Sequence, residues 1–224
     1  MKALVVKIVF SEALFKTHYT KGFRQTYPIP LPSTVAGMFG ALLGIERERV
    51  IETFKDCLFG AKLLEYKGVC PENTSYIQYK GGKPVRGATT SIILNNPSFV
   101  IALVTESKKI KEFHNKVKNS IVFFPYGGQN DFFTENMEII GIKDVKKTLL
   151  IENYAPQDFV KKIEWNKGTE FQVLPVRHKL SLNPNFYFIF KGKLKLKQTI
   201  QTVEGIGVYP LQKFYYLPSK LENR

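Results

Sequence analysis

The sequence predicts an α+β protein with a ferredoxin-like region over residues 1–120, an inserted β-hairpin at about 74–94, and a β-rich region over 121–224. Three observations lead to this prediction. In the first region, apolar runs typical of buried strands alternate with helical stretches. A long strand-like segment broken by two adjacent glycines lies between the second and third of these runs. Beyond residue 121, short strand-like segments are separated by turn residues.

The first elements are an apolar strand and a basic loop. Residues 3–10, ALVVKIVF, are apolar on both faces apart from Lys7, as expected of a central strand covered on both sides. Residues 15–31 have no regular period and mix basic with aromatic side chains, so we expect a loop there, called the basic arm below. Three prolines at its end restrict the residues before them and force an extended approach to the next element: Pro28, Pro30 and Pro32.

A helix is expected to begin at Ser33, acting as N-cap, and to end at Gly44. Its apolar face is formed by residues at helical spacing: Val35, Met38, Phe39 and Leu42. Gly37 and Gly40 lie on a neighbouring face, although an internal glycine costs about 1 kcal/mol relative to alanine. Either protein backbone or a ligand is therefore expected to approach that face closely.

The remaining elements follow from the same periodicities. We expect a short helical stretch at about 46–56, with Val50, Ile51 and Phe54 inward, then strands at 58–66 and 97–105. The hairpin should turn at Gly81-Gly82. Ser107 can cap a helix that runs to about residue 119, and its inward side chains are expected to be Ile110, Phe113 and Val117. Later strands are expected within 137–145, 147–154, 186–197 and 207–218.

Composition excludes several kinds of protein. No run of about eighteen apolar residues occurs, so we expect no transmembrane helix. Lys7 interrupts the N-terminal apolar run and no cleavage site follows, so we expect no signal peptide and a cytoplasmic protein. Cys57 and Cys70 form no CxxC pair and the three histidines are far apart, which predicts neither a metal site nor a cofactor.

The net charge points to a polyanionic partner. The chain has 33 lysine and arginine residues against 19 aspartate and glutamate residues, a formal net charge of +14. The excess runs through the whole chain and is not confined to a tail. A folded protein with this much self-repulsion usually has a polyanion to neutralise it. Composition alone does not separate RNA, DNA and anionic lipid.

The segment RQTYPIPLPSTVAGMFGALLG, residues 24–44, resembles the N-terminal signature of the CRISPR-associated protein 5 family. In that family a strand leads through a basic loop and a proline-rich turn into a helix with the pattern PxPxPST-x-x-G-x-x-G. The inserted hairpin and the β-rich second half are also similar. Residues 125–128, PYGG, stand where relatives carry a P-Y-x-G turn. The resemblance covers residues 1–130, and beyond them only the general plan.

The resemblance implies a ferredoxin-like, RRM-related core of the repeat-associated RNA-binding (RAMP) superfamily. Such proteins are Cascade-type subunits of type I interference complexes in antiviral defense, and they cap the 5′ handle of the guide RNA (crRNA). Their inserted hairpin, the thumb, folds over the RNA near the first guide nucleotides. They contact the neighbouring backbone subunit and the large subunit. We therefore expect a non-catalytic RNA-binding subunit, with target DNA near the protospacer end as a further candidate partner and no membrane contact.

The basic arm supplies the first candidate RNA-binding residues: Lys16, His18, Lys21, Arg24 and Tyr27. Cationic side chains could contact handle phosphates or bases, and Phe23 or Tyr27 could stack on a base. Arg24 is the best single candidate, because a guanidinium suits both phosphates and base edges. The alternative is a solvated loop whose aromatic side chains dock on the core.

Two further places could bind RNA. Free N–H groups at the helix start, around Ser33, form an anion site. The hairpin tip carries charge of one sign beside a tyrosine, which favours RNA contact over an ordinary charged turn. Its candidates are Tyr76, Lys80, Lys83 and Arg86.

The segment KGKLKLK, residues 191–197, allows two interpretations. In a strand, its four lysines would share one face. That face could form a phosphate-facing ribbon, or the lysines could guard an edge strand against aggregation. The sequence does not decide between them.

Catalysis is not expected, and no catalytic residue is assigned. The alternative function is a metal-independent endoribonuclease that processes precursor guide RNA, because one branch of the resembled family does so. Such cleavage activates a 2′-hydroxyl and needs a base, an acid and a cation. The candidate groups are His18 with Tyr19 or Tyr27, and His114 with Lys116 or Lys118. A third possibility is a general RNA-binding or basic membrane-surface protein whose helix motif is coincidental.

Overall fold

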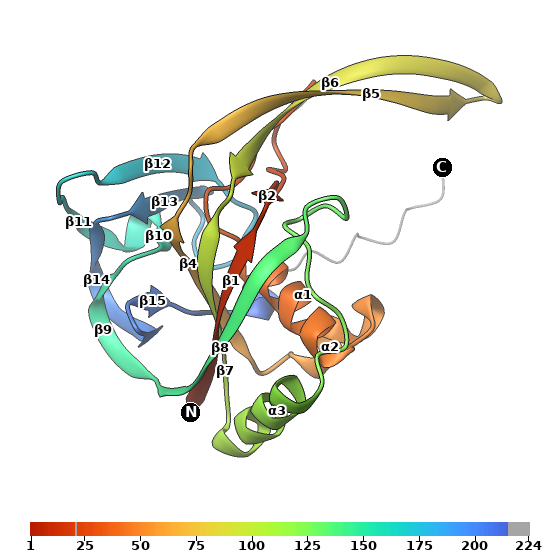
Figure 1. The fold of residues 1–224 in the computed structure, drawn as a ribbon. Coiled ribbons are helices and arrows are strands. Elements are labelled where there is room, and N and C mark those ends of the chain that lie inside the picture. The colour runs from red at the N-terminus through yellow and green to blue at the C-terminus, as the bar shows by residue number, and fades with distance from the viewer. Residues whose placement is uncertain (21, 215–224) are drawn as a thin grey trace.

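A computed structural model describes residues 1–20 and 22–214 and shows a protein built around one five-stranded antiparallel sheet (Figure 1). The strand order is β16 (Tyr209–Pro210), β4 (Leu58–Glu65), β7 (Ser98–Thr105), β1 (Lys2–Phe10) and β8 (Thr134–Asp144). β1 and β7 pair from Lys2 opposite Thr105 to Val9 opposite Ser98. Every residue of β7 is buried, which explains why the two central strands are apolar on both faces.

Two longer helices and one short helix cover one face of this sheet: α1 (Pro32–Leu43), α2 (Val50–Thr53) and α3 (Ser107–Asn119). The inward faces expected for α1 and α3 are confirmed, since all seven of their apolar side chains are buried. With α1 after β1 and α3 after β7, the order is the β-α-β-β-α-β arrangement expected of a ferredoxin-like unit. No helix in the described part of the chain is long and apolar enough to cross a membrane.

Both longer helices begin one or two residues earlier than predicted. Leu31, not Ser33, is the N-cap of α1, and Glu106, not Ser107, is that of α3; neither makes a side-chain cap hydrogen bond. In α1 the reason is Pro32, whose fixed φ and missing N–H suit the first helical position. The predicted end is confirmed, because Gly44 takes the left-handed conformation with a φ of 68°.

The helical stretch expected at 46–56 is shorter than predicted. It consists of a 3₁₀ turn, η1 (Arg47–Arg49), followed by α2. Phe54 is buried as expected, whereas Val50 and Ile51 are only partly buried. A single turn of helix cannot place three side chains inward at once.

The inserted hairpin is confirmed and is longer than predicted. It comprises β5 (Val69–Lys80) and β6 (Lys83–Asn95), and it turns at Gly81 and Gly82, whose φ angles are 55° and 76°. It projects well beyond the rest of the molecule (Figure 1). Near its base, β6 also pairs with two short strands, β2 (Glu12–Ala13) and β3 (Phe23–Arg24).

The second half is rich in strands, as predicted. Two smaller antiparallel sheets contain β9 (Lys146–Ile151), β10 (Tyr154–Pro156), β11 (Val160–Glu164), β12 (Glu170–Pro175), β13 (Asn185–Phe190), β14 (Lys193–Val203) and β15 (Ile206–Gly207), with 3₁₀ turns η2 (Gln157–Phe159) and η3 (Leu211–Lys213). The main sheet takes β8 and β16 from beyond residue 121. The expected ferredoxin-like region would have to include them, and the division at 121 stays a prediction.

The segment 191–197 forms part of a central strand, so the edge-strand interpretation is wrong. Leu194 of β14 lies opposite Ile163 of β11 on one side and Ile151 of β9 on the other. Lys191 precedes the strand, in a turn with a φ of 54°, so it does not share the face of the other three lysines. The phosphate-facing interpretation stays a prediction.

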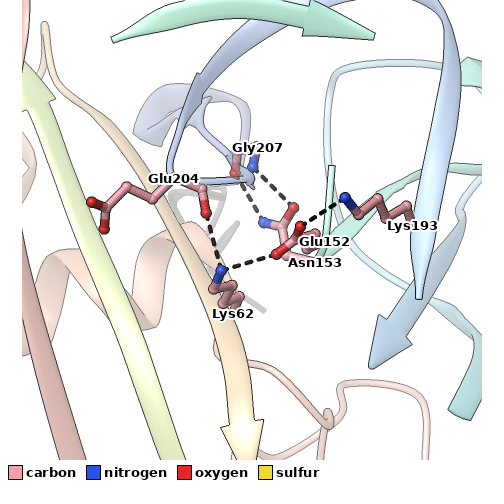
Figure 2. A network of polar contacts seen from close by, with 6 residues as sticks. All are labelled: Lys62, Glu152, Asn153, Lys193, Glu204 and Gly207. Carbon is pink, nitrogen blue, oxygen red and sulfur yellow. Dashed lines mark hydrogen bonds and ion pairs between the residues drawn. The ribbon is translucent and has the colours of Figure 1, made fainter. Parts of the chain in front are cut away.

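A polar network joins the C-terminal strands to the main sheet (Figure 2). Lys62 Nζ, on β4, donates to Glu152 Oε2 at 2.9 Å, and Lys193 Nζ, on β14, lies 3.5 Å from Glu152 Oε1. The buried Asn153 side chain donates to the carbonyl of Gly207 at 2.9 Å and accepts from its N–H at 3.0 Å. β15 lies so close to β4 that a Cβ at Gly60 would meet the Gly207 carbonyl oxygen. These contacts fix β15 against the sheet face opposite the helices.

Two lysines lower the pKa of the Glu152 carboxyl group. Burial acts to raise the pKa of Glu152, but the hydrogen bond and charge of Lys62, together with Lys193, outweigh it and lower the pKa below its ordinary value of 4.5. Because the folded-state pKa is depressed, the stabilisation is present above the unfolded-state pKa. It is lost as the pH falls through the folded-state pKa.

We predict that Glu152→Gln lowers the free energy of unfolding by about 1–3 kcal/mol at neutral pH, since it removes one partner of a partly buried charged network. Urea unfolding at neutral pH, repeated at about pH 3, measures the effect. The difference between wild type and variant should shrink at the lower pH.

Glu112→Gln is the matched control, because Glu112 pairs with Lys116 at 3.3 Å on an exposed helix face. It should change the free energy of unfolding by about 0.5 kcal/mol or less. Equal losses in the two variants would contradict a structural role for the network.

Candidate nucleic-acid interface

A cavity of about 480 Å³ lies between the basic arm, the start of α1 and three segments from later in the chain, which contribute Gly128 with Gln129, Arg177 and Phe214. Five residues predicted from the sequence line it: Lys16, His18, Arg24, Tyr27 and Ser33. Gln129 and Arg177 also line it, and neither was predicted. The fold thus brings half of the candidate residues to one place, together with one further cation.

The arm is more ordered than the expected loop, because its two ends pair with each other. Thr17 N–H donates to the Gln25 carbonyl and Tyr27 N–H donates to the Phe15 carbonyl, both at 2.8 Å. The buried Thr26 hydroxyl accepts from Phe15 N–H and donates to the Tyr27 carbonyl, both at 2.9 Å. These bonds hold Lys16 and His18 in fixed positions on the backbone.

The middle of the basic arm pairs with the hairpin. Phe23 and Arg24 form β3, which pairs in parallel with β6, and Arg24 lies opposite Ser91. Arg24 therefore lies where the arm meets the hairpin base and also lines the cavity. The best candidate from the sequence is held by backbone hydrogen bonds at a junction of two elements.

The PYGG element closes another side of the cavity. Leu14 N–H donates to the Gly127 carbonyl at 2.7 Å, and Gly127 N–H donates to the Phe132 carbonyl at 2.8 Å. A Cβ at Gly127 would meet the carbonyl oxygen of Glu12, and one at Gly128 would meet that of Leu14. Two glycines are thus required for this close approach, which brings Gln129 to the cavity wall.

Tyr27 packs beneath the cavity against the C-terminal strands and fixes the basic arm to them. Its ring is buried and stacks on Phe188 of β13, with centroids 5.7 Å apart and an interplanar angle of 24°. Its hydroxyl donates to the Pro175 carbonyl at 2.8 Å. Tyr27 therefore has no open ring face on which a base could stack, although the sequence had suggested such stacking. Phe23, the other candidate for stacking, is 45% exposed.

The Tyr27 hydroxyl determines which ring nitrogen of His18 carries the hydrogen. That hydroxyl has one hydrogen, which is used on Pro175, so His18 Nδ1, 2.9 Å away, donates to the tyrosine oxygen. Burial and the positive charge of Arg177 lower the pKa of His18. At neutral pH the ring is neutral, and its Nε2 is left as an acceptor.

The start of α1 contributes backbone donors. Pro32 has no N–H, and Val35 N–H donates to the Leu31 carbonyl at 3.0 Å. The N–H groups of Ser33 and Thr34 have no partner within the helix, and both residues line the cavity. The anion site expected at the helix start therefore opens into the same space as the cations.

The hairpin candidates lie outside the cavity. Tyr76 faces Gly87 across the hairpin, and Tyr76 is 45% exposed. Lys83 and Arg86 are exposed, but they are three positions apart in one strand and point to opposite faces of the hairpin. Lys21 and the side chain of Lys80 lie outside the described residues.

Sequence reasoning missed Arg177, which follows β12. A single arginine between two buried residues, Val176 and His178, carries no pattern that separates it from a surface arginine. Of the two catalytic pairings considered, His18 with Tyr27 is in contact. His114 lies on α3 and does not line the cavity.

Comparison with solved structures identifies the fold. A chain of a structure titled "CRISPR RNA-guided surveillance complex" matches with a TM-score of 0.51 and 13% identity, over 97% of this chain and 95% of that one. A "Cas protein" matches with a TM-score of 0.47 and 18% identity, over 88% and 95%. "A CRISPR protein from Archaeoglobus fulgidus" matches with a TM-score of 0.47 and 14% identity, over 94% and 100%. The first match shows that the chain has the α+β fold of a CRISPR protein.

A family model also matches part of the sequence. Residues 3–62 match the family model described as CRISPR-associated protein (Cas_Cas5). This match confirms the resemblance to that family predicted from residues 24–44. It spans β1, the basic arm and α1. No curated protein sequence matches the chain.

We predict that Arg177→Ala raises the pKa of His18, because the variant removes a positive charge that disfavours protonation of the ring. NMR titration of the His18 ring protons measures the pKa. Lys108→Ala, an exposed cation on α3, is the control and should leave the pKa unchanged. If the two variants give the same His18 pKa, Arg177 does not face His18 in solution.

Proposed function

We propose that this protein is a non-catalytic subunit of a type I CRISPR interference complex and binds the 5′ handle of the guide RNA in the cavity beside the basic arm. The proposal rests on one observation, which is that cationic side chains from distant parts of the chain line the same cavity. Lys16 and Arg24 of the basic arm and Arg177, about 150 positions later, all line one cavity with the free N–H groups of α1. The family match and the fold support the same function.

The cavity offers the kinds of contact that an unpaired RNA strand uses. Its three cations can neutralise phosphates, and the N–H groups of Ser33 and Thr34 can donate to phosphate oxygens. The Nε2 of His18 can accept from a 2′-hydroxyl or an exocyclic amine, and the Gln129 amide can read a base edge. Such contacts allow both affinity and discrimination of RNA from DNA.

The hairpin fits the proposed role of a thumb. It projects from the body (Figure 1). At its base, β6 pairs with β3, which carries Arg24 of the cavity. A strand that leaves the cavity past Arg24 meets the hairpin next, where Lys83 on one face or Arg86 on the other can reach phosphates. We include backbone and large subunits as partners, since the matched structure is titled as a complex, and target DNA near the protospacer end.

We predict that replacing Lys16, Arg24 and Arg177 together by alanine weakens binding of handle-bearing guide RNA by tenfold or more, because each removed phosphate contact is charge-assisted. Fluorescence anisotropy over a range of salt concentrations measures the affinity. The slope of log K against log salt should fall in magnitude by about 0.7 for each lost contact.

The matched control is the triple variant Lys108→Ala/Lys111→Ala/Lys118→Ala on α3, which changes the net charge by the same amount. It should leave most of the affinity in place. Equal losses would mean that binding follows net charge alone. A second readout is co-purification, where a genuine subunit retains guide RNA with a uniform 5′ end and the triple cavity variant does not.

A second candidate function, metal-independent cleavage of precursor guide RNA, is favoured by one observation. His18 is neutral with Nε2 unprotonated and lies beside Arg177, so the cavity holds a base together with a cation for the phosphorane. An acid for the leaving 5′-oxygen would still be needed, and the Tyr27 hydroxyl is already bonded to Pro175. Binding without cleavage therefore remains our conclusion.

Incubation with repeat RNA in EDTA separates the two functions. We expect intact RNA with wild type and with His18→Ala. Cleavage at one position by wild type that is absent in His18→Ala, and kept in His114→Ala, would establish the nuclease instead.

A further inference from the structure

A groove with a volume of about 830 Å³ continues from the cavity along α1. Thr34 and Gly128 line both the cavity and the groove, so the two spaces are contiguous. The function proposed above uses the cavity and the hairpin but assigns no role to this groove.

Four exposed aromatic rings line the groove: Phe123, Phe124, Tyr126 and Phe133, with exposed fractions of 66%, 58%, 47% and 61%. Large apolar side chains gathered in one exposed place mark an interaction site. The Tyr126 and Phe133 rings meet edge to face with centroids 5.9 Å apart, and both side chains remain exposed.

The rings are held in place by the backbone. Val122 N–H donates to the Leu42 carbonyl and Phe123 N–H donates to the Ala41 carbonyl, both at 3.2 Å. These bonds satisfy carbonyls at the end of α1 and fix the segment beside the helix. The backbone that carries Phe123 is thus held against α1.

Small residues of α1 line another part of the groove. Gly37 and Ala41 of α1 line it, and a Cβ built at Gly37 would have no atom within 4 Å. Arg47 is the one cation among the described lining residues. Charge is therefore concentrated in the cavity and aromatic surface in the groove, the combination that single-stranded nucleic acids require.

We propose that the groove binds unpaired nucleotides of the same RNA strand that occupies the cavity, with their bases stacked on the exposed aromatic rings. This inference rests on the proposed function and extends its binding site along α1. Continuity with the cavity favours RNA as the occupant, because a strand held at Thr34 and Gly128 enters the groove directly. Arg47 is placed to contact a phosphate of that segment.

The test compares oligoadenylates of about four and about ten nucleotides, since stacking platforms are tolerant of sequence. Wild type should bind the longer oligonucleotide more tightly, by about fivefold or more for each stacked base. The variant Phe123→Leu/Phe124→Leu/Phe133→Leu should lose this gain and keep its affinity for the short one. Phe123→Trp/Phe124→Trp/Phe133→Trp should keep the gain, because indole rings stack.

The leucine variant keeps an apolar surface, so it separates bases from a protein partner. If it binds both RNAs like wild type, or if length brings no gain while Arg24→Ala still weakens the short complex, the groove inference is overturned and the cavity function stands. If it binds RNA like wild type but loses a co-purifying subunit, the groove is a protein-docking site and the inference again falls. If Arg24→Ala affects neither oligonucleotide, the proposed function fails and the groove inference with it. Circular dichroism melting checks that every variant is folded.

Discussion

The position of the Tyr27 side chain is the constraint on which the candidate site depends. Its ring stacks on Phe188 of β13 and its hydroxyl donates to the Pro175 carbonyl, so the basic arm is fixed to the C-terminal strands. The same hydroxyl accepts from His18 and sets the tautomer of that ring. Burial raises the pKa of Tyr27, which keeps the phenol protonated and this set of hydrogen bonds intact. A residue that the sequence suggested as an RNA contact is thus the support of the residues that can make one.

The C-terminal region consequently belongs to the site, since Arg177 and Phe214 line the cavity. Arg177 reaches the cavity because β12 pairs with β13, and β13 carries Phe188 against Tyr27. The Glu152 network, with Lys62 and Lys193, holds β15 and its neighbours on the main sheet (Figure 2). The cavity is therefore produced by packing between segments about 150 positions apart, and not by the family motif alone.

The sequence predicted whatever depends on local periodicity or on neighbouring residues. The buried faces of α1 and α3, the hairpin turn at Gly81-Gly82 and the C-cap at Gly44 follow from spacing and from glycine's access to positive φ. The basic arm was recognisable because its charged residues are close together in sequence. The start of α1 was predicted wrongly, since Pro32 outweighs Ser33 as a start signal. Arg177 and the central position of β14 depend on long-range pairing, which one sequence does not encode in any local pattern.

The parallel pairing of β3 with β6 couples the hairpin to the cavity. Arg24 lies opposite Ser91, so a tilt of the β5–β6 hairpin would displace β3, the strand that carries the Arg24 guanidinium. Linkage is reciprocal: if filling the cavity narrows the range of hairpin orientations, then holding the hairpin tip strengthens binding in the cavity by the same factor. A partner that holds the hairpin tip would therefore change the affinity of the cavity for its ligand without contacting that ligand.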